Sequence, residues 1–220
     1  MPKKENSLQK TASDALKRRW QGHWKRVIGL TGGLGSGKST VLSMFGRKGA
    51  FTFDADGVVR LLLEKDQIVL AQIRRIFGSR VFYPNGRIDK MELARRIFSS
   101  ERDRRKLEGV LHPLVREALA TFLESRKGGS AVCDIPLLFE SGWDEIFDRV
   151  VVVDAPSDVR AARLMKRGMS PRDIKRRLKA QWPLERKTEK ADFVINNAHA
   201  INNTYEQFQK LWSRITHEGD

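Results

Sequence analysis

Residues 32–40 read Gly-Gly-Leu-Gly-Ser-Gly-Lys-Ser-Thr and contain the spacing G-x-x-x-x-G-K-[ST] of a phosphate-binding loop, or P-loop. Glycines permit positive φ, so backbone N–H groups can approach an anion closely, and the following helix N-terminus favours negative charge. Lys38 can reach the β- and γ-phosphates, and the Ser39 hydroxyl can bind Mg²⁺. The loop therefore predicts binding of a nucleoside triphosphate with Mg²⁺. The expected ATP-binding residues are Gly32, Gly33, Gly35, Ser36, Gly37, Lys38, Ser39 and Thr40.

Two acids, Asp54 and Asp56, follow the short apolar segment 51–53. A carboxylate just past the carboxyl end of a strand can accept the proton of an acceptor hydroxyl and orient it for in-line attack on a phosphate. Aspartate also suits a helix N-cap, and the two roles are compatible. We expect Asp56 to be the catalytic base and Asp54 to support it in binding the acceptor.

A third acid, Asp134, ends the apolar run 131–133 and resembles the Walker-B position. A carboxylate there can bind Mg²⁺ directly or through water. The alternative is an acid that only forms a turn, and the sequence leaves both open.

An arginine-rich stretch begins after the apolar run 149–153. Arg163 and Arg167 are four residues apart and share a helical face, where they can stabilise charge on a transferring phosphoryl group. Solvated helix charge is the alternative for such a stretch. Ser170 and Pro171 suit the N-cap and first position of a further helix, and we expect a lid at about residues 168–190.

These residues require elements that position them, and the chain alternates short apolar runs with amphipathic stretches. That alternation is typical of an α/β fold, in which buried parallel strands read as continuous apolar runs. We expect a five-stranded parallel sheet and a C-terminal helix that begins near Ile201. The expected strands are 27–31, 51–53, 130–134, 149–153 and 193–195.

A long helical insertion is expected at about residues 57–128, between the second and third strands. In a P-loop kinase, an insertion here typically carries the acceptor site at the carboxyl edge of the sheet. Asp89 predicts an N-cap with Glu92 three residues later, and Pro113 predicts the first turn of a new helix.

The chain has 220 residues, a net charge of +15 and one cysteine. A positive field suits substrates that carry several phosphates, whereas binding of nucleic acid stays a secondary hypothesis. Residues 1–26 form a basic N-terminal extension, either a disordered arm or a helix packed on the surface. We expect one kinase domain over residues 27–220, a buried Cys133, no disulfide and no membrane span, because no run of about 18 apolar residues occurs.

The motifs together resemble the dephospho-CoA kinase family, the last enzyme of coenzyme A synthesis. The resemblance covers roughly residues 27–215. Beyond the P-loop, it rests on Asp54-Ala55-Asp56, Gly86-Arg87-Ile88-Asp89-Lys90, Leu111-His112-Pro113-Leu114-Val115, Asp134-Ile135-Pro136-Leu137-Leu138-Phe139-Glu140, Arg163-Leu164-Met165-Lys166-Arg167 and Ala191-Asp192-Phe193-Val194-Ile195-Asn196-Asn197.

The resemblance implies a cytoplasmic enzyme that phosphorylates the ribose 3′-hydroxyl of dephospho-CoA with ATP and Mg²⁺. It implies a P-loop NTPase-type three-layer sandwich with a helical CoA-binding insertion and a lid. By the same resemblance, Asp56 is the base, Arg163 and Arg167 contact phosphates, and His112 and Pro113 line the acceptor side. His112 before a proline can instead cap a helix.

Two other functions stay open from the residues alone. One is a different P-loop small-molecule kinase, such as a nucleoside monophosphate kinase. The other is a nucleotide-dependent nucleic-acid-binding protein. The sequence does not indicate the oligomeric state.

Overall fold

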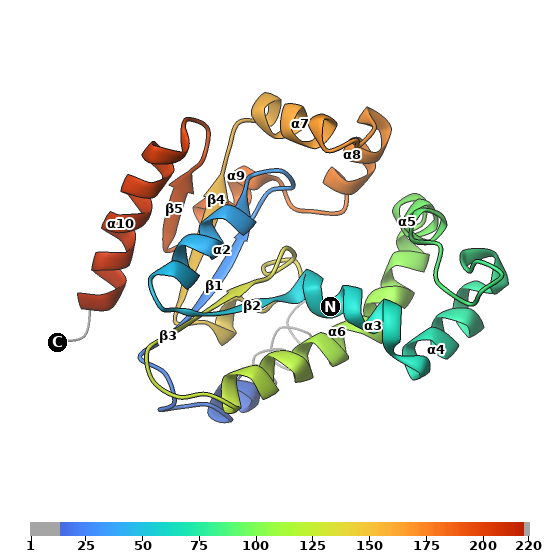
Figure 1. Cartoon of the computed structure of the whole chain (residues 1–220), viewed down its shortest axis with the longest axis horizontal. Coiled ribbons are helices and arrows are strands. Elements are labelled where there is room, and N and C mark those ends of the chain that lie inside the picture. Colours follow the sequence, from blue (N-terminus) through green and yellow to red (C-terminus); the bar gives the residue numbers. More distant parts are fainter. Residues whose placement is uncertain (1–13, 218–220) are drawn as a thin grey trace, which may run out of the picture. The chain divides into compact units, whose positions relative to one another are not determined.

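Five parallel strands form one sheet in the order β2-β3-β1-β4-β5 (Figure 1), in a computed structural model that describes residues 14–217. The strands are β1 (Arg26–Gly32), β2 (Phe51–Asp54), β3 (Ser130–Asp134), β4 (Arg149–Asp154) and β5 (Phe193–Asn196). Every neighbouring pair is parallel, so the predicted α/β sheet is confirmed. Val150 to Val153 on β4 are all buried, as the apolar run predicted.

The chain divides into two compact units. The sheet unit comprises the residues up to Asp54 and those from Phe122 onward, and the helical unit comprises Ala55–Thr121. Among the described residues, no helix is long and apolar enough to cross a membrane.

One face of the sheet is covered by α2 (Lys38–Arg47) and α10 (Ile201–His217). Phe45 of α2 contacts Phe208 and Trp212 of α10, with ring centroids 4.9 and 5.8 Å apart. On β1, Gly29 lies so close to Leu138 and Phe147 that a Cβ would clash with both side chains. This unit also contains α7 (Ser157–Lys166), α8 (Pro171–Leu178), α9 (Leu184–Glu189) and the short helix η2 (Asp144–Ile146).

The described part of the basic extension packs onto the sheet unit. Trp20 is 2% exposed. The Trp24 indole donates to the Leu123 carbonyl at 2.9 Å and stacks on Phe122. Lys17 pairs with Asp148 at 2.9 Å. Residues 14–18 are helical, so this part follows the surface-packed alternative, and residues 1–13 lie outside the described residues.

The helical unit is held by one apolar cluster. Its helices are α3 (Ala55–Lys65), α4 (Gln67–Phe77), the short helix η1 (Ser79–Val81), α5 (Lys90–Ser99) and α6 (Glu101–Glu124), which continues into the sheet unit. The buried members of the cluster are Val69, Ile73, Phe77, Val81, Ile88, Leu93, Leu107 and Leu111.

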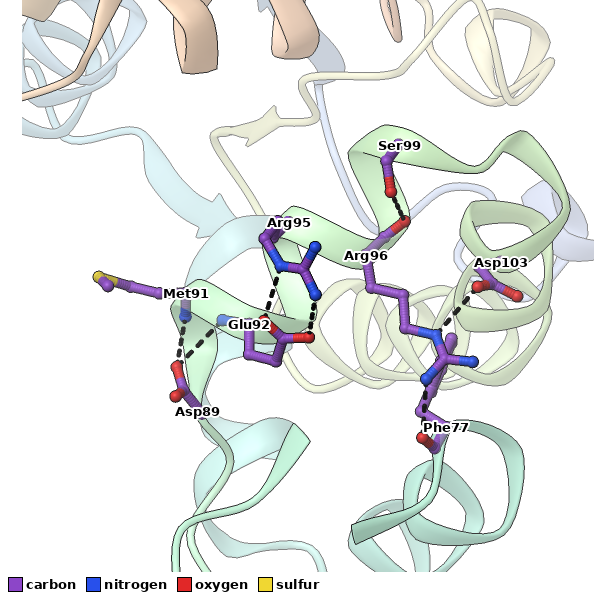
Figure 2. Close-up of polar contacts among 8 residues, drawn as sticks. All are labelled: Phe77, Asp89, Met91, Glu92, Arg95, Arg96, Ser99 and Asp103. Atoms are coloured by element: carbon purple, nitrogen blue, oxygen red, sulfur yellow. Dashed lines mark hydrogen bonds and ion pairs between the residues drawn. The ribbon is translucent and has the colours of Figure 1, made fainter. Parts of the chain in front are cut away.

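Polar groups cap the ends of these helices, as Figure 2 shows for α5. The Asp89 carboxylate accepts from the N–H groups of Met91 and Glu92, both at 3.0 Å, which confirms the predicted N-cap. The Arg96 guanidinium donates to the Phe77 carbonyl and to Asp103, again at 3.0 Å, and so joins the end of α4 to α6.

The predicted helix start at Pro113 is wrong, because Pro113 lies inside α6. Leu107, Leu111, Val115 and Leu119 are all buried and repeat every four residues across the proline. That continuous apolar stripe favours one helix over two, and packing overrides the local tendency of proline to end or begin a helix.

Candidate active site

The P-loop joins β1 to α2 and has a conformation that glycine alone adopts readily. Gly32, Gly35 and Gly37 have φ values of 155°, 80° and 92°. A Cβ on Gly33 would lie 2.8 Å from the Arg160 guanidinium, and one on Gly32 would collide with the Val153 carbonyl. Gly32, Gly35 and Gly37 are therefore required by backbone geometry, as the sequence predicted for a loop that cradles phosphate.

The start of α2 is open to an anion. Gly37 is the N-cap, and as a glycine it has no side chain to bond to the first N–H groups of the helix. The first turn holds no acidic residue but contains Lys38, and the following Ser39 and Thr40 are exposed. Unsatisfied N–H groups, the helix dipole and a lysine together favour a polyphosphate.

Three side chains from distant segments hold the loop backbone. The Asn197 amide donates to the Ser36 carbonyl at 2.7 Å, and Arg163 donates to the same oxygen at 3.4 Å. At the other end, the Leu34 N–H donates to the Gln181 carboxamide at 3.2 Å. Hydrogen bonds to α7, to the residues after β5 and to the segment after α8 thus set the loop conformation.

Two acids end the neighbouring strands β2 and β3, and β3 lies beside the P-loop strand β1. Asp54 on β2 and Asp134 on β3 are register partners, and Asp134 also pairs in register with Leu30 of β1. Asp134 is 9% exposed, whereas Asp54 is exposed. The carboxyl edge of the sheet unit therefore presents two carboxylates, and the buried one, Asp134, is the last residue of the strand next to β1.

Hard oxygen donors of this kind fit Mg²⁺. Among the described residues, no group of three or more His, Cys, Asp or Glu could hold a metal ion. Mg²⁺ does not need such a cage, since it usually keeps several waters and takes one or two protein oxygens plus substrate phosphates. Binding of Mg²⁺ by Ser39 and Asp134 stays a prediction.

Arg163 and Arg167 lie in different environments. Arg163 in α7 is half-buried, and its second nitrogen donates to the Asn197 carbonyl at 2.8 Å. Arg167 is the exposed C-cap of α7. The Ser170 hydroxyl accepts from the Asp173 N–H at 3.2 Å, which confirms the predicted N-cap of α8. A phosphate contact by either arginine stays a prediction.

Three predicted acceptor residues belong to the helical unit. Asp56 lies in the first turn of α3 and is exposed. His112 and Pro113 lie in α6, the first half-buried and the second exposed. Burial lowers the pKa of His112; Glu108 opposes this shift and Arg116 adds to it. The histidine is therefore a neutral donor or acceptor near pH 7, and its contact with the acceptor stays a prediction.

The sequence analysis assigned no role to a buried ion pair in the sheet unit. Lys187 of α9 is fully buried, and its ammonium lies 2.9 Å from both a Glu140 carboxylate oxygen and the Pro136 carbonyl. Burial lowers the pKa of Lys187, while the bond to Glu140 opposes that shift. The same Glu140 oxygen accepts from the Trp182 N–H at 2.8 Å. Lys187 lies in a charged segment of the sequence, and charged segments are usually exposed, so the sequence did not indicate that this lysine is buried.

Asn197 and Gln181 were not assigned a role from the sequence, although both have a recognisable signal. Asn197 follows β5 directly, and polar residues at the carboxyl ends of parallel strands gather at one edge of the sheet. Gln181 follows α8 after a short turn.

Cys133 is buried, as predicted, and burial raises the pKa of its thiol, so it is unsuited to nucleophilic chemistry.

Comparison with known proteins gives one consistent family. A family model described as dephospho-CoA kinase matches residues 26–203. The dephospho-CoA kinase of Anaeromyxobacter dehalogenans is 42% identical over 179 residues, covering 80% of this chain and 85% of the relative. That of Methylococcus capsulatus is 40% identical over 173 residues, covering 78% and 87%.

Solved structures share the fold. A Thermus thermophilus protein is similar with a TM-score of 0.73 and 32% identity, covering 86% of this chain and 96% of that one. The dephospho-CoA kinase from Campylobacter jejuni has a TM-score of 0.62 at 23% identity, covering 90% and 100%, and supports the fold alone. With the family model spanning the P-loop, the sheet and the helical unit, this chain belongs to the dephospho-CoA kinase family.

Proposed function

We propose that this enzyme transfers the γ-phosphoryl group of ATP to the ribose 3′-hydroxyl of dephospho-CoA, giving CoA and ADP. The observation that carries the proposal is the glycine cradle at the open N-terminus of α2, with Lys38 in its first turn, in a chain of this family. Such a cradle binds a nucleotide polyphosphate, and the family specifies the acceptor.

Catalysis rests on positioning and on stabilisation of charge, because phosphoryl transfer requires little covalent chemistry from the protein. In this proposal the loop N–H groups and Lys38 bind the phosphates of ATP. Asp56 orients the 3′-hydroxyl and takes its proton, while Asp54 supports it. Arg163 and Arg167 contact phosphates from the lid side, and His112 and Pro113 contact the acceptor.

Ser39 and Asp134 would hold Mg²⁺, which neutralises phosphate charge when bound. Asp134 is nearly buried at the end of β3, so its carboxylate is held by the sheet. An ATP-dependent enzyme of coenzyme metabolism of this kind would work in the cytoplasm.

The identity of the acceptor is tested by comparing candidate substrates in separate assays. The purified full chain is given ATP and equal concentrations of dephospho-CoA, AMP, CMP, GMP or shikimate, and ADP release is measured. We expect kcat/KM for dephospho-CoA to exceed that for every other acceptor by at least about a hundredfold. Preference for a nucleoside monophosphate or shikimate contradicts the proposed substrate.

The assigned residues are tested by Lys38→Ala and Asp56→Ala. Both variants should lose turnover by about a thousandfold or more, with unfolding midpoints close to wild type, because both side chains are accessible to solvent. Glu64→Ala, an exposed acid of the same α3 helix, is the matched control and should keep its activity. Near-normal kcat in Asp56→Ala would refute the base assignment.

A further inference from the structure

Asn197 is buried where the P-loop enters α2. It is 5% exposed, and its Nδ2 donates to the Ser36 carbonyl at 2.7 Å. Its Oδ1 accepts from the Thr204 hydroxyl at 2.8 Å, and Thr204 is itself fully buried. Because a carbonyl only accepts, the nitrogen must face Ser36, and the Thr204 hydroxyl keeps the amide in that orientation.

The contact between Asn197 and the loop leaves no free space. A Cβ on Gly37 would collide with the Asn197 amide nitrogen, and Gly37 has a φ of 92°. Arg163 adds a second donor to the Ser36 carbonyl and also donates to the backbone carbonyl of Asn197, so Arg163 holds both the loop and the backbone of residue 197. The P-loop, α7 and the segment after β5 therefore meet at one carbonyl oxygen.

That carbonyl decides where a neighbouring N–H group points. Ser36 C=O and Gly37 N–H belong to one peptide unit, and in a planar trans unit the two bonds point in opposite directions. The described chain has no cis peptide bonds. Because Asn197 and Arg163 hold the Ser36 carbonyl on their side of the loop, the Gly37 N–H points away from these two side chains.

We infer that Asn197 is a positioning residue for the nucleotide phosphates, acting through the Ser36–Gly37 peptide, with Thr204 fixing its amide. This inference rests on the proposed ATP-dependent function and adds to it a buried polar support outside the P-loop motif. Asn197 bonds to the loop backbone, so its loss should weaken ATP binding and leave the acceptor KM unchanged.

The test compares Asn197→Asp with Asn196→Asp. Aspartate at 197 keeps the size but replaces the donor to Ser36 with an acceptor, so two oxygens would repel. Aspartate at 196 adds the same charge one residue earlier and keeps the acceptor that bonds the Ala198 N–H at 2.9 Å. Thr204→Val removes only the hydroxyl, and Thr204→Ser restores it.

Binding of ATP is measured by calorimetry without acceptor, and KM and kcat are measured beside it. We expect the ATP dissociation constant to rise about tenfold or more in Asn197→Asp and about threefold in Thr204→Val. Asn196→Asp and Thr204→Ser should stay within about twofold of wild type. A purely structural role would instead lower the melting temperature and the active fraction, with ATP affinity unchanged.

An ATP affinity in Asn197→Asp equal to that of Asn196→Asp would overturn this inference alone. If Asn197→Asp fails to fold by circular dichroism, the Thr204 pair decides, and equal affinities in Thr204→Val and Thr204→Ser would overturn it. Failure of the wild-type chain to bind ATP would overturn the proposed function as well.

Discussion

The sheet unit and the helical unit use polar side chains in different ways. In the sheet unit, buried and half-buried side chains bond to backbone groups more than a hundred residues away, as Asn197 and Arg163 do to Ser36. In the helical unit, most polar contacts cap a helix or join side chains three or four residues apart, such as Asp89 with Glu92 and Arg105 with Glu101.

The difference follows from what each unit must hold in place. A phosphate cradle needs several N–H groups aimed at one point, which calls for buried bonds in a low-dielectric interior. Helices that pack around an apolar cluster need polar partners only for the unsatisfied backbone groups at their ends. Single polar substitutions should therefore be costly in the sheet unit and mild in the helical unit.

The largest effect is expected for Lys187→Met. It leaves the Glu140 carboxylate and the Pro136 carbonyl buried without their ammonium partner. Breaking a buried ion pair in this way costs about 3–5 kcal/mol. The free energy of unfolding in urea measures the loss, and Lys190→Met, at an exposed position, should be close to wild type.

A double variant sharpens the same point. Lys187→Met with Glu140→Gln should cost less than the sum of the single changes, because the second change removes the stranded charge. Additive losses would mean that the pair is not energetically coupled, and the proposed contrast between the units would fail.

In the helical unit, Arg96→Met should have the greatest effect of the polar changes shown in Figure 2. The variant loses the bonds to Asp103 and to the Phe77 carbonyl. The Arg96 side chain is 37% exposed, so we expect the free energy of unfolding, measured by chemical unfolding, to fall by only about 1–2 kcal/mol. Arg95→Met, which loses an exposed pair with Glu92, should leave the free energy of unfolding close to that of the wild type. Equal losses would contradict this ranking.

Asp89→Ala removes the N-cap of α5 and should cost about 1 kcal/mol. Asp89→Asn keeps an oxygen acceptor and should restore most of that loss. Thermal unfolding of both variants beside wild type measures the difference, and a loss in Asp89→Asn as large as in Asp89→Ala would argue against the cap.

The smallest effect concerns the pH dependence of stability. Burial lowers the pKa of His112 below its ordinary value of 6.5. The unfolded chain then binds the proton more readily, so this group's stabilisation is complete above pH 6.5 and is lost as pH falls toward the folded pKa. His112→Gln should lose that component, seen as a smaller drop in melting temperature between about pH 7.5 and about pH 5. An unchanged drop would contradict the assigned shift.

Local pattern was sufficient for much of the fold. The five strands, the caps at Asp89 and Ser170 and the C-terminal helix each depend on a few consecutive residues, and all were predicted. Pro113 was misread because a buried stripe that extends on both sides of it outweighs its own preference. The burial of Lys187 was missed because its partners, Glu140 and Pro136, are distant in sequence.

The sequence by itself determined the P-loop and the family, because consecutive backbone amides bind phosphate and a short motif encodes them. The tertiary structure alone decided what holds that loop in place. The partners of the Ser36 carbonyl, Arg163 and Asn197, lie 127 and 161 residues away, and only the parallel sheet brings their strands and helices together. No local periodicity reports such a contact, since it depends on the order of strands in space.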